Sequence, residues 1–487
     1  MSVPTLETPL LDAVAEEARP SHDRWSELNG RFLDHVAENP EYLERATFAS
    51  LEEPWRRAFP SQPWPFFVGA EQHAEMVRVG LGMDRLMKST LERFLGGDIA
   101  RVRDFYRYGD GDEWSPRRTV FSNPAVFPRL ISGPTGISGA PTRGDFTEGP
   151  DGFLCMEYNA GGRLGVMQLD GIGELYLRCP PIARFLEATG RTARAPDTIT
   201  AQFRHLVDDT IRLGAWTGGD FNVAVVVRPN DGYYGDMFVD WRYNASLRQA
   251  LDERGMAGGR AILCGPEDFR GDEDGGMRVE GERIHLVLEH HDGTGRMLPQ
   301  LRAFKERRLN LVSGPLGFVL SDKGNIAYLS ENAGSDEFTA EERAFIERHV
   351  PWTRRVQPGL TRFHGRGFRV PDDLADRREE FVLKKACSIG GHAVLVGRFR
   401  TDAEWRDDLA RATREQDWVV QEYVAPRPYC FQAGERGAVR HDMVWGLFVF
   451  GEHFGGALLR MMPHTGTGGV VNAERGALCG VALEVED

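Results

Sequence analysis

Apolar residues recur at helical spacing in the first part of the chain. They lie three and four positions apart through Leu10–Arg19 and Glu71–Leu95, and a proline-rich segment, Pro60–Pro65, interrupts them. Aromatic residues of that segment, such as Trp64, are better explained by packing than by ligand binding. The pattern predicts an N-terminal helical region, residues 1–120, that serves as scaffold.

Near residue 143 the helical spacing of apolar residues gives way to strand-like segments. Two runs with strand character, Gly144–Thr147 and Phe153–Tyr158, flank Gly149–Gly152, whose glycines, proline and aspartate form a turn signal. The segment therefore predicts a β-hairpin. A helix-like run, Leu175–Thr189, follows and is punctuated by prolines.

Three oxygen-bearing side chains converge on this hairpin. Side chains alternate between the faces of a strand, so Glu157 and Asn159 project together, and the turn brings Asp145 opposite Met156 or Glu157. Facing carboxylates repel each other, which indicates a cation or strong donors between them. Oxygen ligands of this kind suit Mg²⁺ better than zinc. The alternative is a surface hairpin whose acids are solvated.

A second unit, residues 201–350, alternates strands with a helix. Asn222–Val227 is a nearly continuous β-branched run typical of a buried strand, and Ala245–Gly255 has helical character. Ala261–Cys264 and Ile284–Glu289 predict further strands. The order favours a small parallel α/β unit, and because no GxGxxG turn follows the first strand, a dinucleotide-binding fold is not predicted.

Residues His290, His291 and Asp292 are of the types that ligate metals. Adjacent side chains on a strand point to opposite faces, however, so they cannot converge on one ion while the strand continues. We interpret this triplet as a turn at the end of a strand.

The final unit, residues 351–487, contains a lysine beside a glycine-containing loop. Phe381–Lys385 predicts a strand, Ala386–Ala393 a flexible loop, and Val394–Val396 the next strand. Alternation places Lys384 on the face opposite Phe381 and Leu383. An ammonium group next to unhindered backbone N–H groups is a recurring way to hold triphosphate. The alternative is an edge strand whose lysines deter aggregation.

Three further elements complete this unit. Thr401–Thr413 is an amphipathic helix, and Trp418–Val424 is apolar and then abruptly polar, as expected of a strand that passes from a core into a cleft. Val444–Phe450 and Phe454–Arg460 flank a Gly-Glu turn and predict a hairpin with Arg460 at its far end.

Composition and charge predict a small-molecule partner. The chain has 487 residues, enough for several units, and a net charge of −14, which argues against general binding to nucleic acid. Six cysteines form no CxxC pair, so neither a disulfide framework nor a cysteine-rich zinc site is predicted. No apolar run reaches membrane-spanning length, and the N-terminus lacks a signal-peptide pattern. We expect a cytoplasmic protein without membrane or nucleic-acid partners.

The order VLK, glycine loop, VVQEY and a hairpin ending in arginine resembles the nucleotide-binding half of the ATP-grasp enzymes. In that superfamily an Asp and a later Glu-x-Asn normally follow the lysine strand, whereas Asp145 and Glu157-Tyr158-Asn159 precede it here. The chain is therefore similar to the circularly permuted ATP-grasp proteins related to the synthetase part of glutathionylspermidine synthetase. PPIARFL, VPWTRRV and WVVQEYV also look like that group, and the resemblance covers most of the chain from about residue 60.

The resemblance implies a role for individual residues. The metal ligands would be Asp145, Glu157 and Asn159. The nucleotide-binding set would be Lys323, Lys384, Gly390, Gly391, Gln421, Glu422 and Val424, with the last three meeting adenine. Arg143 and Arg460 match catalytic positions that face phosphate or the reaction intermediate. Two departures concern the loop that covers the nucleotide, since Lys385 stands where relatives have proline and His392 where they have a small or basic residue.

The fold class implied is α/β (α+β), an ATP-grasp fold in permuted order. Residues 121–200 would be the permuted segment with the metal hairpin, 201–350 a pre-ATP-grasp domain, and 351–487 the nucleotide-binding subdomains. The implied activity uses ATP and Mg²⁺ to join a carboxylate and an amine through an acyl phosphate, releasing ADP and phosphate. A homodimer is a further expectation. Alternatives are a small-molecule kinase and a nucleotide-binding protein without turnover. The permuted order also predicts that the hairpin and Lys384 share one site.

Overall fold

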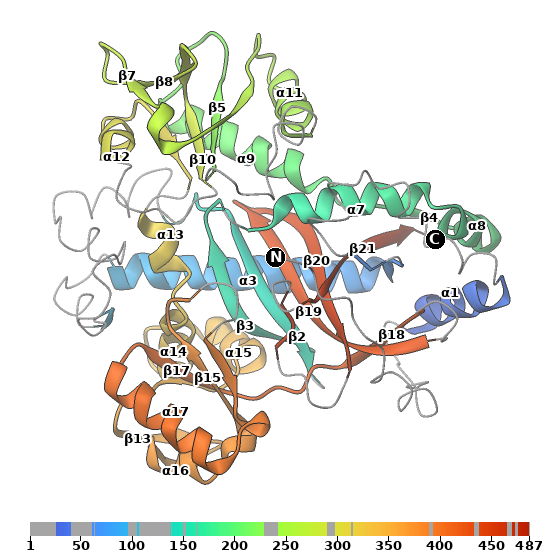
Figure 1. Ribbon diagram of the computed structural model, residues 1–487, viewed down its shortest axis with the longest axis vertical. Helices are drawn as coiled ribbons and strands as arrows, with labels where there is room; N and C mark the ends of the chain where they lie inside the picture. Colours follow the sequence, from blue (N-terminus) through green and yellow to red (C-terminus); the bar gives the residue numbers. More distant parts are fainter. Residues whose placement is uncertain are drawn as a thin grey trace.

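In the computed structural model, the three largest sheets of the described residues are stacked along the long axis of the molecule (Figure 1). It describes residues 26–39, 61–62, 64–95, 105–106, 137, 139–149, 152–162, 164–227, 242–289, 298–312, 315–388, 393–432, 438–464, 470–472 and 476–486. The predicted helix Leu10–Arg19 and the triplet His290, His291 and Asp292 lie outside these residues.

The largest sheet contains the predicted hairpin at one edge. Its strands lie in the order β1-β21-β20-β19-β2-β3, with β18 paired to β19 and β4 to β21. The bounds are β1 Phe66–Val68, β2 Thr142–Gly149, β3 Gly152–Ala160, β4 Thr192–Arg194, β18 Pro428–Gln432, β19 Ala438–Phe450, β20 His453–Pro463 and β21 Leu478–Glu486. Both predicted hairpins, β2–β3 and β19–β20, are confirmed, and their antiparallel pairing places them side by side.

Helices cover both faces of this sheet. Successive side chains on its strands point to opposite faces, and apolar side chains occur on both. On β19, Trp445 and Leu447 face the long helix α3 (Ala70–Leu95), as predicted for Glu71–Leu95. Phe448 and Phe450 face helices α7 (Val166–Arg178) and α9 (Thr198–Leu213) on the other side. The single predicted run Leu175–Thr189 is divided at Cys179 between α7 and α8 (Pro180–Thr189).

The second sheet confirms the small parallel α/β unit. Its strands are β5 Val223–Val226, β6 Ala261–Cys264, β10 Leu286–Glu289 and β11 Asn310–Leu311, in the order β11-β10-β5-β6 and all parallel. Helices α9, α11 (Asn244–Asp252) and α12 (Leu298–Lys305) accompany it, and a small antiparallel sheet joins β7 Arg270–Gly271, β8 Met277–Val279 and β9 Glu282–Ile284.

The third sheet carries the predicted lysine strand. It is antiparallel, in the order β12-β17-β15-β16, with β12 Thr353–Arg355, β15 Phe381–Lys385, β16 Val394–Val396 and β17 Trp418–Glu422. Helix α17 (Asp402–Glu415) packs on the face that carries Leu383 and Val420. Beside it lie the hairpin β13 (Gly359–Phe363) and β14 (Arg366–Val370) and the short helix α16 (Asp372–Ala375). Strands from residues 351–487 therefore contribute to three sheets: the large sheet, this four-stranded sheet and the β13–β14 pair.

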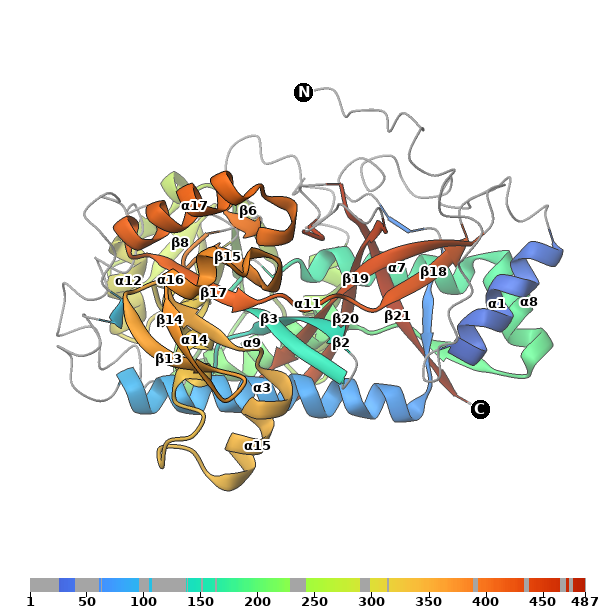
Figure 2. The ribbon, with the colours of Figure 1, turned by 90° about the horizontal axis from the view of Figure 1, so that it is seen from below.

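Three helices connect the second sheet to the third. They are α13 (Pro315–Leu320), α14 (Gly324–Glu331) and α15 (Ala340–His349), and α13 and α15 both contact β3. At the other end of the molecule α1 (Ser26–Glu38) packs near α8 (Figure 2). The connecting helices thus lie beside the predicted metal hairpin.

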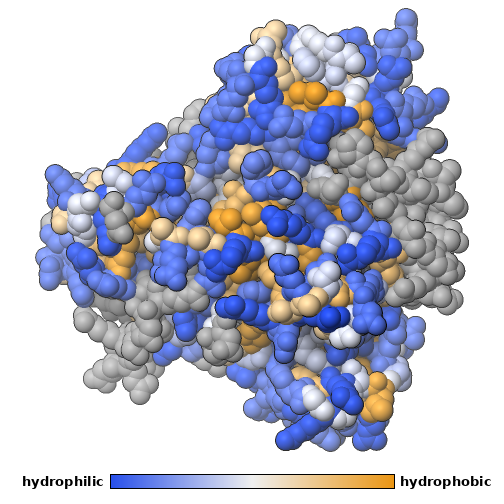
Figure 3. Space-filling model, turned by 180° about the vertical axis from the view of Figure 1, so that it is seen from behind, coloured by the Kyte–Doolittle hydropathy of each residue, from blue (hydrophilic) through white to orange (hydrophobic). Residues whose placement is uncertain are grey.

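The described part of the face seen from behind is mainly polar. Seen from behind, hydrophilic residues cover most of the face, and apolar residues gather in smaller patches near its middle (Figure 3). Among the described helices, none combines the length and the apolar character that a membrane crossing requires.

Candidate functional site

The hairpin β2–β3 has the register that the sequence predicts. Asp145 pairs with Glu157 and Arg143 pairs with Asn159, so these four side chains share one face of the large sheet. The opposite face of the hairpin carries Tyr158, which is buried against α3. The turn residues Pro150 and Asp151 lie outside the described residues.

Asp145 is surrounded by donors. Arg143 donates to it from Nε at 2.7 Å and from Nη2 at 2.9 Å, and Arg460 Nη2 of β20 lies 2.7 Å from Oδ2. Asn159 Nδ2 donates to the same oxygen at 3.2 Å. Burial raises the pKa of Asp145, but the charges of Arg143 and Arg460 more than offset this, so the carboxyl pKa lies below its ordinary value. Asp145 is therefore a buried carboxylate that stays ionised.

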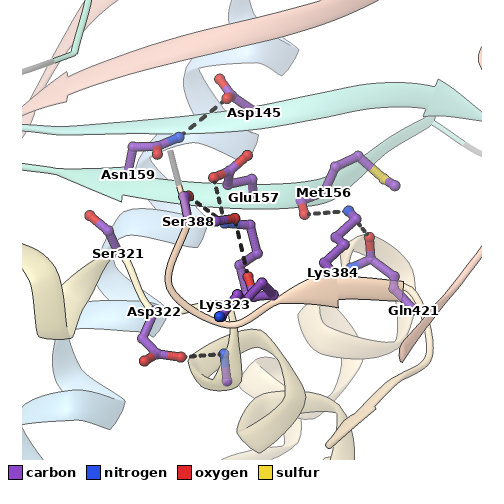
Figure 4. A network of polar contacts seen from close by, with 12 residues as sticks. Asp145, Met156, Glu157, Asn159, Ser321, Asp322, Lys323, Lys384, Ser388 and Gln421 are labelled. Atoms are coloured by element: carbon purple, nitrogen blue, oxygen red, sulfur yellow. Dashed lines mark hydrogen bonds and ion pairs between the residues drawn. The ribbon is translucent and has the colours of Figure 1, made fainter. Parts of the chain in front are cut away.

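Glu157, its cross-strand neighbour, has a different partner. Lys323 Nζ lies 3.0 Å from Glu157 Oε1 and donates to the carbonyl of Ser388 at 3.1 Å. Lys323 is the N-cap residue of α14, and its backbone N–H donates to the carbonyl of Ala386 at 2.9 Å. Lys323 thus connects the hairpin to the loop after β15 (Figure 4). The predicted second nucleotide lysine lies within the site.

Lys384 reaches the hairpin from the third sheet, as predicted. Its Nζ donates to the carbonyl of Met156, 228 positions away, at 3.0 Å and to Gln421 Oε1 at 2.5 Å (Figure 4). Burial lowers the pKa of Lys384 to about 8, with Glu157 opposing and Lys323 reinforcing this shift. Lys385 points to the other face, where it pairs with Asp417 at 3.2 Å. Lys384 is therefore a buried ammonium hydrogen-bonded to neutral groups.

The predicted adenine-binding residues divide between the two faces of β17. Gln421 is buried, and its Nε2 donates to Thr353 Oγ1 at 3.1 Å while its oxygen accepts from Lys384. The Glu422 side chain lies on the opposite face, opposite Phe381 in the register, and its Oε1 lies 2.7 Å from His364 Nε2. Val424 lies beyond the end of β17, and its Cγ1 is 3.5 Å from the position that a Cβ atom would take at Gly149 of the hairpin.

The donor set fits a hard divalent ion in part. Glu157 offers a partly exposed carboxylate, and Asn159 keeps its Oδ1 after donating its amide to Asp145. Both oxygens are of the type that binds Mg²⁺. Within the described part of the chain, no group of three or more His, Cys, Asp and Glu residues is arranged to hold a metal ion. A metal here would therefore need ligands from the substrate, as Mg²⁺ commonly takes from phosphates.

Several residues that shape the site carry no sequence signal. Asp84 of α3 accepts from Thr142 Oγ1 at 2.5 Å and from Tyr158 OH at 2.8 Å, which fixes the back of the hairpin. Ser321 Oγ accepts from the Ala160 N–H at 2.9 Å at the end of β3. These contacts join segments far apart in sequence, so no local motif reveals them. The predicted loop residues Gly390, Gly391 and His392 lie outside the described residues.

Comparison with known proteins identifies the fold. No protein-family model matches the chain, and no curated protein matches it in sequence. A solved structure of a glutathione synthetase-like effector from Globodera pallida, in its apo form, is similar with a TM-score of 0.56, covering 95% of this chain and 99% of that chain at 11% identity. A likeness at this identity shows the fold alone. The chain therefore has a mixed α/β fold of the glutathione synthetase-like kind, and the permuted order stays a prediction.

Proposed function

We propose that the protein is an ATP-dependent ligase of ATP-grasp type that joins a small carboxylic acid to an amine and releases ADP and phosphate. The proposal combines the glutathione synthetase-like fold with the convergence of the hairpin and the lysine strand. Fold likeness alone cannot assign an activity, so the argument depends on the charges at the site.

The observation that carries the proposal is a surplus of buried positive charge. Four basic side chains and two acidic ones meet at the site: Arg143, Arg460, Lys323 and Lys384 with Asp145 and Glu157. Two positive charges are thus left without an acid in this group. Buried charges are costly unless they are paired, so the site is built for an anionic ligand. A triphosphate supplies that charge, and a divalent ion adjusts the balance.

The residues suit phosphoryl transfer from ATP to a carboxylate. Lys384 and Lys323 would hold phosphate oxygens from the side of β15 and α14, and Glu157 with Asn159 would hold Mg²⁺ from the hairpin. When bound, Mg²⁺ would neutralise phosphate oxygens and orient them for transfer. Arg143 and Arg460 would stabilise negative charge on the acyl phosphate and on the oxygen that forms when the amine attacks. Such transfer needs positioning and charge neutralisation, so no nucleophilic side chain is required.

The test is coupled product release with trapping of the intermediate. A panel of amino acids, peptides and polyamines is screened for ADP and phosphate release from Mg-ATP. The proposal predicts stoichiometric ADP and phosphate only when an acid and an amine are both present, and a hydroxamate when hydroxylamine replaces the amine. AMP as the nucleotide product would contradict it. A phosphorylated product without free phosphate would establish the kinase alternative, and nucleotide binding with no turnover across the panel would favour the non-catalytic one.

A further inference from the structure

Asp145 and Glu157, which are both predicted from the sequence as metal ligands, have different surroundings. Asp145 is almost fully buried, with a side chain 5% exposed, whereas the Glu157 side chain is 31% exposed. Glu157 meets one cation, Lys323. Asp145 accepts hydrogen bonds from four groups, of which two come from Arg143, one from Arg460 and one from Asn159. Three of these hydrogen bonds reach Oδ2 and one reaches Oδ1, so Oδ2, which has two lone pairs, has none left for a metal ion.

The space around Asp145 is closed from the side of β19 as well. Gly446 lies opposite Asp145 in the register between β19 and β2. A Cβ atom at Gly446 would lie 2.9 Å from Arg143 Cδ and 3.3 Å from Asp145 Oδ1. The absence of a side chain at this position lets Arg143 and Asp145 pack directly over β19. Oδ1 therefore has the β19 backbone beside it, and Oδ2 already accepts three of the four hydrogen bonds.

We propose that Asp145 is a positioning residue that holds Arg143 and Arg460 for the reaction, and that Glu157 and Asn159 provide the protein's metal ligands without it. The inference rests on the proposed function and changes the role of one predicted ligand. Asp145 joins guanidinium groups from β2 and from β20, which are not neighbouring strands because β19 lies between them. It also takes the amide N–H of Asn159, which leaves the Asn159 oxygen for the metal.

The charge balance agrees with this division of roles. The group formed by Arg143, Arg460 and Asp145 keeps one positive charge after internal pairing, which can face an acyl phosphate. Glu157, in contrast, can exchange Lys323 for a metal ion, and this would free the lysine for phosphate. A metal at Asp145 would have to displace the buried guanidinium group of Arg460 and that of Arg143, whose side chain is only 12% exposed, leaving both without an acid.

Two isosteric variants, Asp145→Asn and Glu157→Gln, distinguish the roles because each removes one negative charge. Mn²⁺ binding in the presence of ADP is measured by electron paramagnetic resonance, and ADP release is measured against Mg²⁺ concentration. Glu157→Gln should weaken Mn²⁺ binding more than about 100-fold, because loss of a charged direct ligand exceeds the about 10- to 100-fold cost of losing a residue that only orients a ligand. Asp145→Asn should keep Mn²⁺ affinity within about tenfold, because it removes a nearby charge and one acceptor for the Asn159 amide but no metal contact, while its turnover at saturating Mg²⁺ falls about 100-fold or more.

Equal loss of Mn²⁺ affinity in both variants would overturn the inference while leaving the proposed function intact. Failure of the wild-type protein to bind Mn-ADP at all would instead refute the proposed function. Asp145→Asn leaves two buried guanidinium groups with a neutral partner, so the double variant Asp145→Asn/Arg460→Met is measured too, since it removes one charge of each sign. Retained Mn²⁺ affinity in the double variant supports the inference, and its loss contradicts it.

Discussion

Lys384 differs from every other cation at the site because it is buried among neutral partners. The carbonyl of Met156 and the amide oxygen of Gln421 orient it without cancelling its charge. Lys384→Ala should therefore weaken Mg-ATP binding about tenfold or more, the value of a charged hydrogen bond. Calorimetry measures this. Lys385→Ala is the matched control, because Lys385 pairs with Asp417 on the other face.

The same lysine predicts how nucleotide affinity depends on pH. Burial lowers the Lys384 pKa to about 8, and phosphate binds the protonated form. ATP affinity should be full below pH 8 and fall as the pH rises through that value, and binding near pH 8 should take up a proton. Calorimetry in buffers of different ionisation enthalpy detects the uptake. Affinity that is constant from pH 6.5 to about 9 would show that the charge of Lys384 does not contribute.

Gln421 accepts a hydrogen bond from Lys384 without neutralising its charge. The Gln421 amide is held in this orientation because its Nε2 donates to Thr353 Oγ1. Gln421→Glu would give Lys384 a carboxylate partner, so ATP affinity should fall about tenfold. Glu422→Gln is the control on the opposite face and should change affinity less than about twofold, since its partner His364 is exposed. If both variants behave alike, the amide of Gln421 has no special role.

At the scale of single elements, helix α17 stabilises the lysine sheet from outside the site. Thr401 forms a capping box with Glu404 at its N-terminus, and both partners bond to backbone N–H groups. Thr401→Ala should lower the free energy of unfolding by about 1 kcal/mol without changing ATP affinity. Thr413→Ala on the same helix is the control, because its hydroxyl only donates back to Leu409. Denaturant titration compares the two.

Elements with a clear period could be predicted from the sequence, and short ones could not. The run Asn222–Val227 contains β5, and the alternation in Phe381–Lys385 identifies β15 with Lys384 on the correct face. The two-residue strand β11 is too short for any period to show. Strand β21 was not predicted, although its alternation is visible: Cys479, Val481, Leu483 and Val485 face one core.

The candidate site shows the same limit. Its main residues could be predicted, because their types and positions on strands indicate metal and phosphate binding: Asp145, Glu157, Asn159 and Lys384. Their partners could not. Asp145 meets Arg460 and Lys384 meets Met156 only because a strand from the end of the chain and a separate sheet reach the same hairpin. Contacts of this kind depend on the topology, which one-dimensional periodicity does not contain.

At the scale of the whole molecule, two sheets and a connecting helix meet at one hairpin. The large sheet contributes β2, β3 and β20, the third sheet contributes β15 and β17, and the connecting helix α14 contributes Lys323. A ligand at the hairpin would therefore contact the large sheet, the third sheet and helix α14 at the same time. This arrangement explains why an anion with several charged groups suits the site better than a single small ion.

The most direct test of the account is a crystal structure of the protein with Mg²⁺ and a non-hydrolysable ATP analogue. The account predicts that the phosphates lie between Lys384 and Lys323 on one side and Glu157 and Asn159 on the other, with Mg²⁺ on the last two. It also predicts that Asp145 keeps its bonds to Arg143 and Arg460. Nucleotide bound away from the β2–β3 hairpin, or phosphates that contact neither lysine, would contradict it.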